Sequence, residues 1–123
     1  MNKRNIILIG MPGAGKSSVG VILAKVLGYE FIDTDLVIQH REKRLLREII
    51  ADEGNEGFLA IENEVNATLE ADKSVIAPGG SAIYGKEAME HFKEIGTIVY
   101  LKLSYEDLAK RLGADYVINT KEE

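Results

Sequence analysis

The sequence predicts an α/β protein with three layers, in which helices cover both faces of a mainly parallel sheet. Short apolar runs alternate along the chain with longer segments of helical periodicity, as expected for that class. The first run, residues 6–9, is apolar without alternation, which is typical of a strand buried on both faces. The length of 123 residues fits one compact domain, and we expect residues 1–123 to form it. In such a fold, ligands bind at the carboxyl ends of the strands.

The first part of the chain contains two expected strands, each followed by a helix. Residues 5–9 form the first strand and residues 17–27 the first helix, with Gly28 suited to the C′ position. The buried face of this helix is predicted from apolar residues at helical spacing: Val19, Ile22, Leu23, Val26 and Leu27. A short strand, residues 31–32, ends at Asp33, and the second helix begins near Asp35.

The alternation continues through the rest of the chain. Helical segments are expected over residues 45–51 and in a following stretch with the inner stripe Phe58, Ile61, Val65 and Leu69. The strand Ser74–Ala77 stops at a Pro-Gly-Gly turn, residues 78–80. A helix over residues 86–94, a strand over 97–103, a helix opened by Ser104 and a last strand over 116–119 complete the predicted order.

A phosphate-binding loop follows the first strand. The segment from Gly10 to Ser17 satisfies G-x-x-x-x-G-K-[ST] and lies between a buried strand and a helix, where this motif must lie. Its glycines let backbone N–H groups surround a phosphate, Lys16 reaches the β- and γ-phosphates, and the Ser17 hydroxyl ligates Mg²⁺. We therefore predict ATP and Mg²⁺ as cofactors. The expected nucleotide-binding residues of the loop are Gly13, Ala14, Gly15, Lys16, Ser17 and Ser18.

A dinucleotide-binding fingerprint is the main alternative for this loop. Gly13 and Gly15 open a helix, and Asp33 stands about where a ribose-binding acid would. However, Ser18 occupies the place of the third glycine, and Lys16 has no role in that alternative. The sequence therefore favours phosphoryl transfer.

Two carboxylates, Asp33 and Asp35, follow the second strand and form the expected acceptor side of the site. We expect them to point to different sides of the chain, one toward the Mg²⁺ shell and the other toward an acceptor. Asp35 also has a structural interpretation, because an acid at the start of a helix is favoured by capping alone.

Composition excludes several classes of function. The formal net charge is −5 and the pI is near 5.1, so no basic excess is available for nucleic acid. The chain has no cysteine, and the apolar run near its start is too short for a signal peptide or a membrane span. We expect a cytoplasmic monomer with no membrane partner. One basic cluster is expected to be a solvated helix face, interrupted by acids: His40, Arg41, Lys43, Arg44 and Arg47.

The ordered set of motifs resembles the shikimate kinase family from the N-terminus to about Gly113. The set consists of the P-loop with Lys16-Ser17-Ser18, then Asp33-x-Asp35, Phe58-x-x-x-Glu62, Gly79-Gly80 and the strand at residues 97–103. The resemblance implies a P-loop kinase fold. It also implies ATP-dependent phosphorylation of a hydroxyl group on shikimate or a similar small acid, in aromatic amino-acid biosynthesis.

The resemblance also implies roles for individual residues. Ser17 and Asp33 would serve Mg²⁺, Asp33 through water, and Asp35 would hold the attacking hydroxyl and accept its proton. Gly79 and Gly80 would offer backbone N–H groups to the acceptor. Arg111 matches an arginine that lies against the adenine, although an exposed arginine in the last turn of a helix is an equal alternative.

The chain departs from the family pattern at two places in the acceptor site and at one place further on. Leu59 replaces an arginine that binds the substrate carboxylate, and Ser81, after Pro78, replaces the third glycine of a Thr-Gly-Gly-Gly run. After Gly113 the sequence passes directly to a strand-like stretch without the family's lid segment, so that either the protein lacks a lid or the lid is missing from these 123 residues. Two alternatives to shikimate phosphorylation therefore stay open: a related kinase with another carboxylated polyol as acceptor, and a nucleotide-binding protein without turnover.

Overall fold

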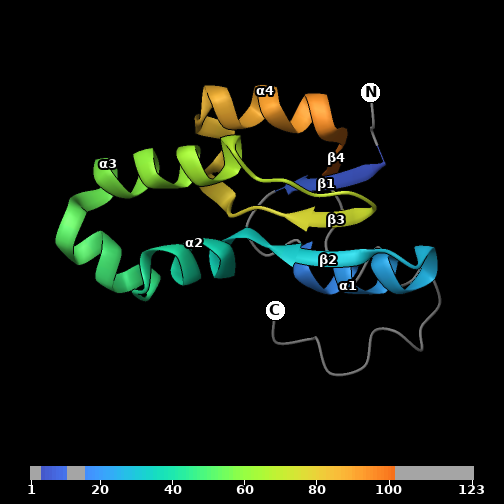
Figure 1. The fold of residues 1–123 in the computed structure, drawn as a ribbon, viewed down its shortest axis with the longest axis horizontal. Coiled ribbons are helices and arrows are strands. Elements are labelled where there is room, and N and C mark those ends of the chain that lie inside the picture. Colours follow the sequence, from blue (N-terminus) through green and yellow to red (C-terminus); the bar gives the residue numbers. More distant parts are fainter. Residues whose placement is uncertain (1–3, 11–15, 102–123) are drawn as a thin grey trace.

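The computed structural model describes residues 4–10 and 16–101, which form four strands and five helical segments (Figure 1). The elements are β1 (Asn5–Gly10), α1 (Lys16–Leu27), β2 (Glu30–Asp33), α2 (Thr34–Glu42), α3 (Leu46–Ala67), β3 (Ser74–Ala77), the 3₁₀ helix η1 (Gly80–Tyr84), α4 (Lys86–Ile95) and β4 (Gly96–Leu101). Apart from η1, which was not predicted, each of these elements corresponds to an expected strand or helical segment, with ends that differ by a few residues. The predicted helix after Ser104 and the strand at residues 116–119 lie outside the described residues.

The four strands form one parallel sheet in the order β2-β3-β1-β4. Ile7 of β1 pairs with Ile76 on one side and with Ile98 on the other. Because all strands run the same way, their carboxyl ends meet at one edge of the sheet: Asp33 lies beside Ala77, and Gly10 beside Leu101. The prediction of a mainly parallel sheet is confirmed for this part of the chain.

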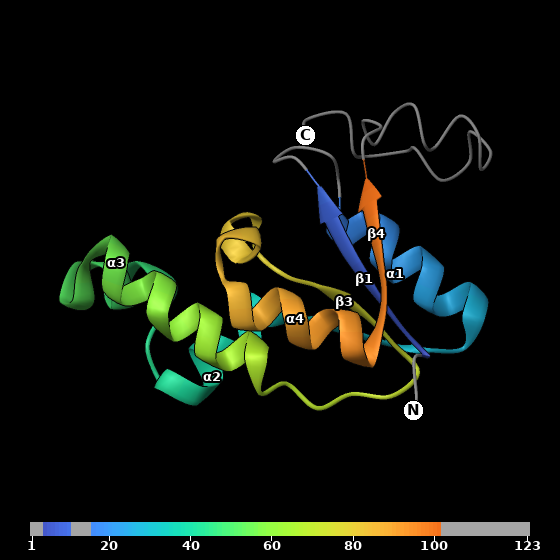
Figure 2. The ribbon, with the colours of Figure 1, turned by 90° about the horizontal axis from the view of Figure 1, so that it is seen from above.

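Helices cover the sheet on both faces, with α1 on one and α4 on the other (Figure 2). Successive residues of a strand point to opposite faces, so the apolar run of β1 supplies both cores. Leu8 packs with Val19 and Ala24 of α1. The neighbouring side chains of β1 pack with Ala88 and Phe92 of α4. This double burial explains why the run shows no polar alternation.

The predicted buried face of α1 needs one correction. Val26 is 75% exposed and Leu27 43% exposed, whereas Ala24 is buried. The helix approaches the sheet along Val19, Gly20 and Ala24, which turns Val26 toward solvent. Gly28 has a φ of 72°, as its predicted C′ position requires.

Helices α2 and α3 extend beyond the sheet and enclose a third core of Ile38, Ile49 and Val65 (Figure 1). The two helical segments expected around residues 45–51 and 58–69 are the two parts of α3, which are separated by a kink at the non-helical residue Gly54. Gly54 has φ 76° and ψ 173°, a conformation open almost only to glycine. The arm formed by α2 and α3 delivers residues from α3 to the carboxyl edge of the sheet.

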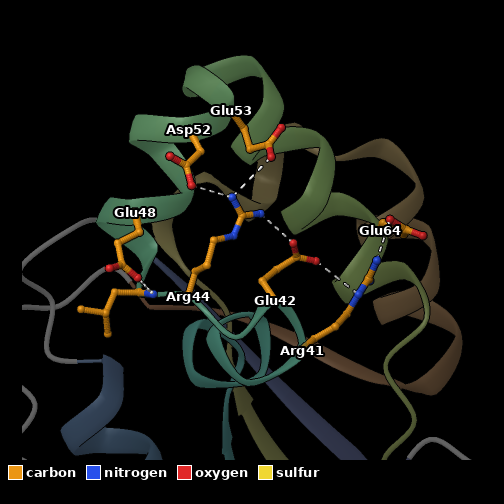
Figure 3. Close-up of polar contacts among 8 residues, drawn as sticks. Arg41, Glu42, Arg44, Glu48, Asp52, Glu53 and Glu64 are labelled. Carbon is orange, nitrogen blue, oxygen red and sulfur yellow. Dashed lines mark hydrogen bonds and ion pairs between the residues drawn. The ribbon is translucent and has the colours of Figure 1, made fainter.

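Ion pairs connect the end of α2 to both halves of α3 (Figure 3). The Arg44 guanidinium lies close to three carboxylates: Glu42 at 2.9 Å, Asp52 at 3.0 Å and Glu53 at 3.4 Å. Arg41 pairs with Glu64 at 3.0 Å. Arg41 is exposed, as expected of a solvated face, whereas Arg44 is half-buried because α3 folds back and brings its acids to it.

Among the described residues, no helix is both long and apolar enough to cross a membrane.

Candidate active site

A pocket of about 200 Å³ lies at the carboxyl edge of the sheet. Its lining comes from the segments that follow β1, β2 and β3: Lys16, Ser17, Asp33, Asp35, Ala77, Pro78, Gly79 and Gly80. Six of these eight residues are predicted site residues, and they come from three separate motifs. The structure thus brings the phosphate-binding and acceptor-binding motifs to one place.

Lys16 and Ser17 are the first two residues of α1, so they lie where the helix dipole and free backbone N–H groups favour an anion. The Lys16 ammonium Nζ donates a hydrogen bond to the Gly10 carbonyl at 3.2 Å. The Ser17 side chain is exposed to the pocket. Ser18 is half-buried and does not line the pocket. Gly13, Ala14, Gly15 and Arg111 lie outside the described residues.

Asp33 and Asp35 line the same pocket, which corrects the expectation that they point to different sides. Two residues apart on an extended chain share a face, and α2 in any case begins between them, at Thr34. Asp33 is the N-cap of α2: its Oδ1 accepts a hydrogen bond from the Asp35 backbone N–H at 2.9 Å. The N-cap is therefore Asp33 and not Asp35, which lies in the first turn of α2, where the helix dipole also favours an acid, and lines the pocket.

The protonation of Asp35 is shifted by its surroundings. Partial burial raises the pKa of its carboxyl above the ordinary value, and the nearby Asp33 charge raises the pKa further. The Lys16 ammonium opposes both effects and lowers the pKa. The site therefore combines a cation with a pair of carboxylates, one of which holds its proton more tightly than usual.

Gly79, in the turn after β3, lies against two acidic side chains, Asp35 and Glu62. A Cβ at this position would lie 3.0 Å from Asp35 Oδ1 and 3.1 Å from Glu62 Oε2. Glycine therefore brings the loop backbone against two carboxylates, where a side chain would crowd both. Gly80 begins η1 and faces open space.

Glu62 is a site residue to which the sequence analysis assigned no role. It is only 2% exposed, and its Oε1 accepts a hydrogen bond from the Ser81 hydroxyl at 2.7 Å. Burial raises the pKa of its carboxyl, and the Asp35 charge adds to this effect, while the Ser81 hydrogen bond lowers the pKa. One signal was available: Glu62 lies next to Ile61 within the apolar stripe of α3, at a position that should face the core.

The two departures from the family pattern meet at a second cavity, of about 290 Å³, between α3 and η1. Leu59 and Ser81 both line this cavity, together with Glu62 and Lys86. Leu59 is half-buried and brings no charge to the site. Neither departure touches the phosphate-binding residues.

The donor set of the first pocket fits Mg²⁺. The Ser17 hydroxyl and the Asp33 carboxylate are hard oxygen donors of the kind that Mg²⁺ prefers. In the part of the chain that the structure describes, no group of three or more His, Cys, Asp or Glu side chains could hold a metal ion by itself.

Comparisons with known proteins identify the family that the chain resembles over most of its length. A family model described as "Shikimate kinase" matches residues 12–120. The chain is 38% identical over 112 residues to shikimate kinase 2 of Yersinia pseudotuberculosis, an alignment that covers 91% of the chain and 64% of the relative. Shikimate kinase 2 of Yersinia enterocolitica is 39% identical over the same coverage. The chain thus spans a little under two thirds of the length of these relatives.

Solved structures give a similar result. The shikimate kinase from Acinetobacter baumannii in complex with shikimate superposes with a TM-score of 0.73 and 35% identity, covering 94% of this chain and 65% of that one. The shikimate kinase from Bacteroides thetaiotaomicron superposes with a TM-score of 0.71 and 32% identity, covering 88% of this chain and 62% of that one.

Proposed function

Because the chain belongs to the shikimate kinase family, we propose that it transfers the γ-phosphoryl group of ATP to a hydroxyl group of shikimate. The observation that supports this most directly is the convergence of the P-loop, the Asp33–Asp35 pair and the Gly79–Gly80 loop on one pocket. We also propose a single-domain, monomeric, cytoplasmic enzyme of aromatic amino-acid biosynthesis.

The proposal assigns one set of residues to the nucleotide and Mg²⁺. In this proposal the backbone N–H groups of Gly13, Ala14 and Gly15, with Ser18, surround the phosphates. Lys16 neutralises charge on the β- and γ-phosphates. Ser17 and Asp33 hold Mg²⁺, Asp33 through water, and Arg111 lies against the adenine. When bound, Mg²⁺ supplies positive charge to the phosphate oxygens.

Asp35 and the glycine loop serve the acceptor. The hydroxyl oxygen of shikimate bonds to the γ-phosphorus, the bond between that phosphorus and the β–γ bridging oxygen breaks, and ADP leaves with the bond's electrons. Asp35, which lines the pocket beside Gly79, accepts the hydroxyl proton. Gly79 and Gly80 orient the acceptor through their backbone N–H groups.

A coupled assay of ADP release tests the proposal. Release that depends on shikimate supports it, whereas tight ATP binding without release identifies a nucleotide-binding protein. Release only with another carboxylated polyol identifies a related kinase, the second candidate. That candidate is favoured by Leu59 and Ser81, which change the wall next to the acceptor loop.

A further inference from the structure

The two residues that depart from the family pattern at the acceptor site are connected through a third, Glu62. Leu59 precedes Glu62 by three residues in α3, a spacing that places side chains side by side on a helix. Ser81 comes from η1 and donates its hydroxyl hydrogen bond to Glu62 Oε1 at 2.7 Å. All three residues line the same 290 Å³ cavity. The substitutions at residues 59 and 81 therefore alter the surroundings of one buried carboxylate.

The second oxygen of that carboxylate faces the acceptor loop. Glu62 Oε2 is buried and has no hydrogen-bond partner among the described residues. It lies 3.1 Å from the position that a Cβ on Gly79 would take, and Asp35 Oδ1 lies 3.0 Å from the same position. The backbone of the Gly79–Gly80 loop therefore lies against both Glu62 and Asp35, so a change in the orientation of Glu62 would alter what this loop packs against.

A buried carboxylate is costly unless it receives hydrogen bonds or a cation. An arginine at residue 59 would lie one helical turn from Glu62 and could supply both, but leucine supplies neither. In the described part of the chain, the Ser81 hydroxyl is the only group that donates a hydrogen bond to the Glu62 side chain. Ser81 therefore provides the support that Leu59 does not.

We propose that Ser81 is a positioning residue of the acceptor site, which holds Glu62 in place of an arginine at residue 59 and thereby fixes the Gly79–Gly80 loop. This inference rests on the proposed function. It makes the effects of substitutions at residues 59 and 81 interdependent, although the residues lie in different elements and 22 positions apart in the sequence.

The test is a double-mutant cycle with Ser81→Ala, Leu59→Arg and the two combined, and with Ser81→Thr as the variant that keeps a hydroxyl. We expect Ser81→Ala to raise KM for shikimate by roughly tenfold, because the buried Glu62 carboxylate loses the hydrogen bond that holds it beside the acceptor loop. The Kd for ATP should stay unchanged, and Ser81→Thr should keep most of the wild-type KM. In the Leu59→Arg background the same Ser81→Ala change should raise KM less than about threefold.

Equal effects of Ser81→Ala in both backgrounds would overturn the inference. So would a Ser81→Thr variant as impaired as Ser81→Ala, or a loss of ATP affinity in parallel with the loss of acceptor affinity. The midpoint of thermal unfolding of the same variants gives a readout that does not depend on activity. If the wild type releases no ADP with shikimate, the proposed function fails. In that case, additive changes in the unfolding midpoint for Ser81→Ala and Leu59→Arg would overturn the coupling of residues 59 and 81 through Glu62. Non-additive changes would support it.

Discussion

At the scale of single residues, Lys16 is a residue whose removal should abolish activity without affecting folding. Its ammonium group lies in the pocket and bonds only the Gly10 carbonyl among the described residues, so the core does not depend on it. We predict that Lys16→Ala abolishes shikimate-dependent ADP release, because the charge that opposes the β- and γ-phosphates is lost. The far-UV circular dichroism spectrum should stay unchanged.

The control is Lys25→Ala, which removes an exposed lysine from the last turn of the same helix. This variant should keep full activity. Unchanged turnover of the Lys16→Ala protein would contradict the placement of the nucleotide site.

Leu59 tests the identity of the acceptor. If the acceptor is shikimate, Leu59→Arg should lower KM for shikimate by roughly tenfold or more, because the arginine gives the carboxylate of shikimate a charged partner. Steady-state kinetics at saturating ATP measure this change. Leu59→Met is the matched control, since it lengthens the side chain without adding charge. A wild-type KM that is already low, with no gain in the arginine variant, would mean that another cation binds the carboxylate.

Glu62 makes stability depend on pH. Burial and the Asp35 charge raise the pKa of its carboxyl in the folded state. Its stabilising contribution is therefore complete below the unfolded-state pKa of about 4.3 and is lost as pH rises through the folded-state pKa. We predict that Glu62→Gln, which keeps an acceptor for Ser81, gains stability relative to wild type between pH 5 and pH 8.

Urea unfolding at several pH values, without nucleotide or metal, measures this difference. Glu56→Gln, an exposed site on the same helix, should show no such trend. A constant difference between Glu62→Gln and wild type across the pH range would show that Glu62 is equally charged in both states.

At the scale of elements, the arm formed by α2 and α3 is shaped by one glycine and one arginine. Gly54 takes φ 76° and ψ 173°, and Arg44 joins the end of α2 to the residues just before this kink (Figure 3). The kink lets α3 run from the tip of the arm back to η1, where Glu62 meets Ser81. The acceptor side of the site thus depends on backbone geometry at a residue that does not line the pocket.

We predict that Gly54→Ala destabilises the protein by about 1–3 kcal/mol, because a side chain is strained in this backbone conformation. Chemical denaturation measures the change in the free energy of unfolding. Asn55→Ala, at the adjacent exposed position, should change it little. A Gly54→Ala variant as stable as wild type would mean that α3 can straighten at no cost.

At the scale of the whole molecule, few arginine side chains are available to contact the γ-phosphate. Arg111 is the only arginine after Arg47, and the family resemblance places it against the adenine. A delivered arginine is worth about 10³–10⁵ in kcat in well-studied phosphoryl transfer enzymes. We predict that a protein of this sequence binds ATP–Mg²⁺ but phosphorylates shikimate at least about a thousandfold more slowly than a relative with a lid.

Side-by-side kcat measurements test this prediction, with intact mass spectrometry to verify that the protein has the 123 residues given. Calorimetric titration with ATP and Mg²⁺ verifies binding. Brisk turnover by material of the verified mass would show that the lid segment is dispensable or that a second subunit supplies it.

The sequence by itself determined the strand order along the chain, the parallel sheet and the position of the pocket. These follow from local patterns: an unalternated apolar run marks a doubly covered strand, and a P-loop must lie between such a strand and a helix. Parallel strands bring their carboxyl ends to one edge, so Lys16, Asp33 and Gly79 had to lie near one another.

Only the tertiary structure decided which polar side chains meet across elements. The sequence around Arg44 suggests an exposed side chain, but in the structure α3 folds back and pairs Asp52 with it. Val26 has the spacing of a core residue but faces away from the sheet. Ser81 and Glu62 are 19 residues apart, on helices whose packing no local pattern encodes. Periodicity determines which face of an element is apolar, but the partner of a buried carboxylate depends on how two elements pack together.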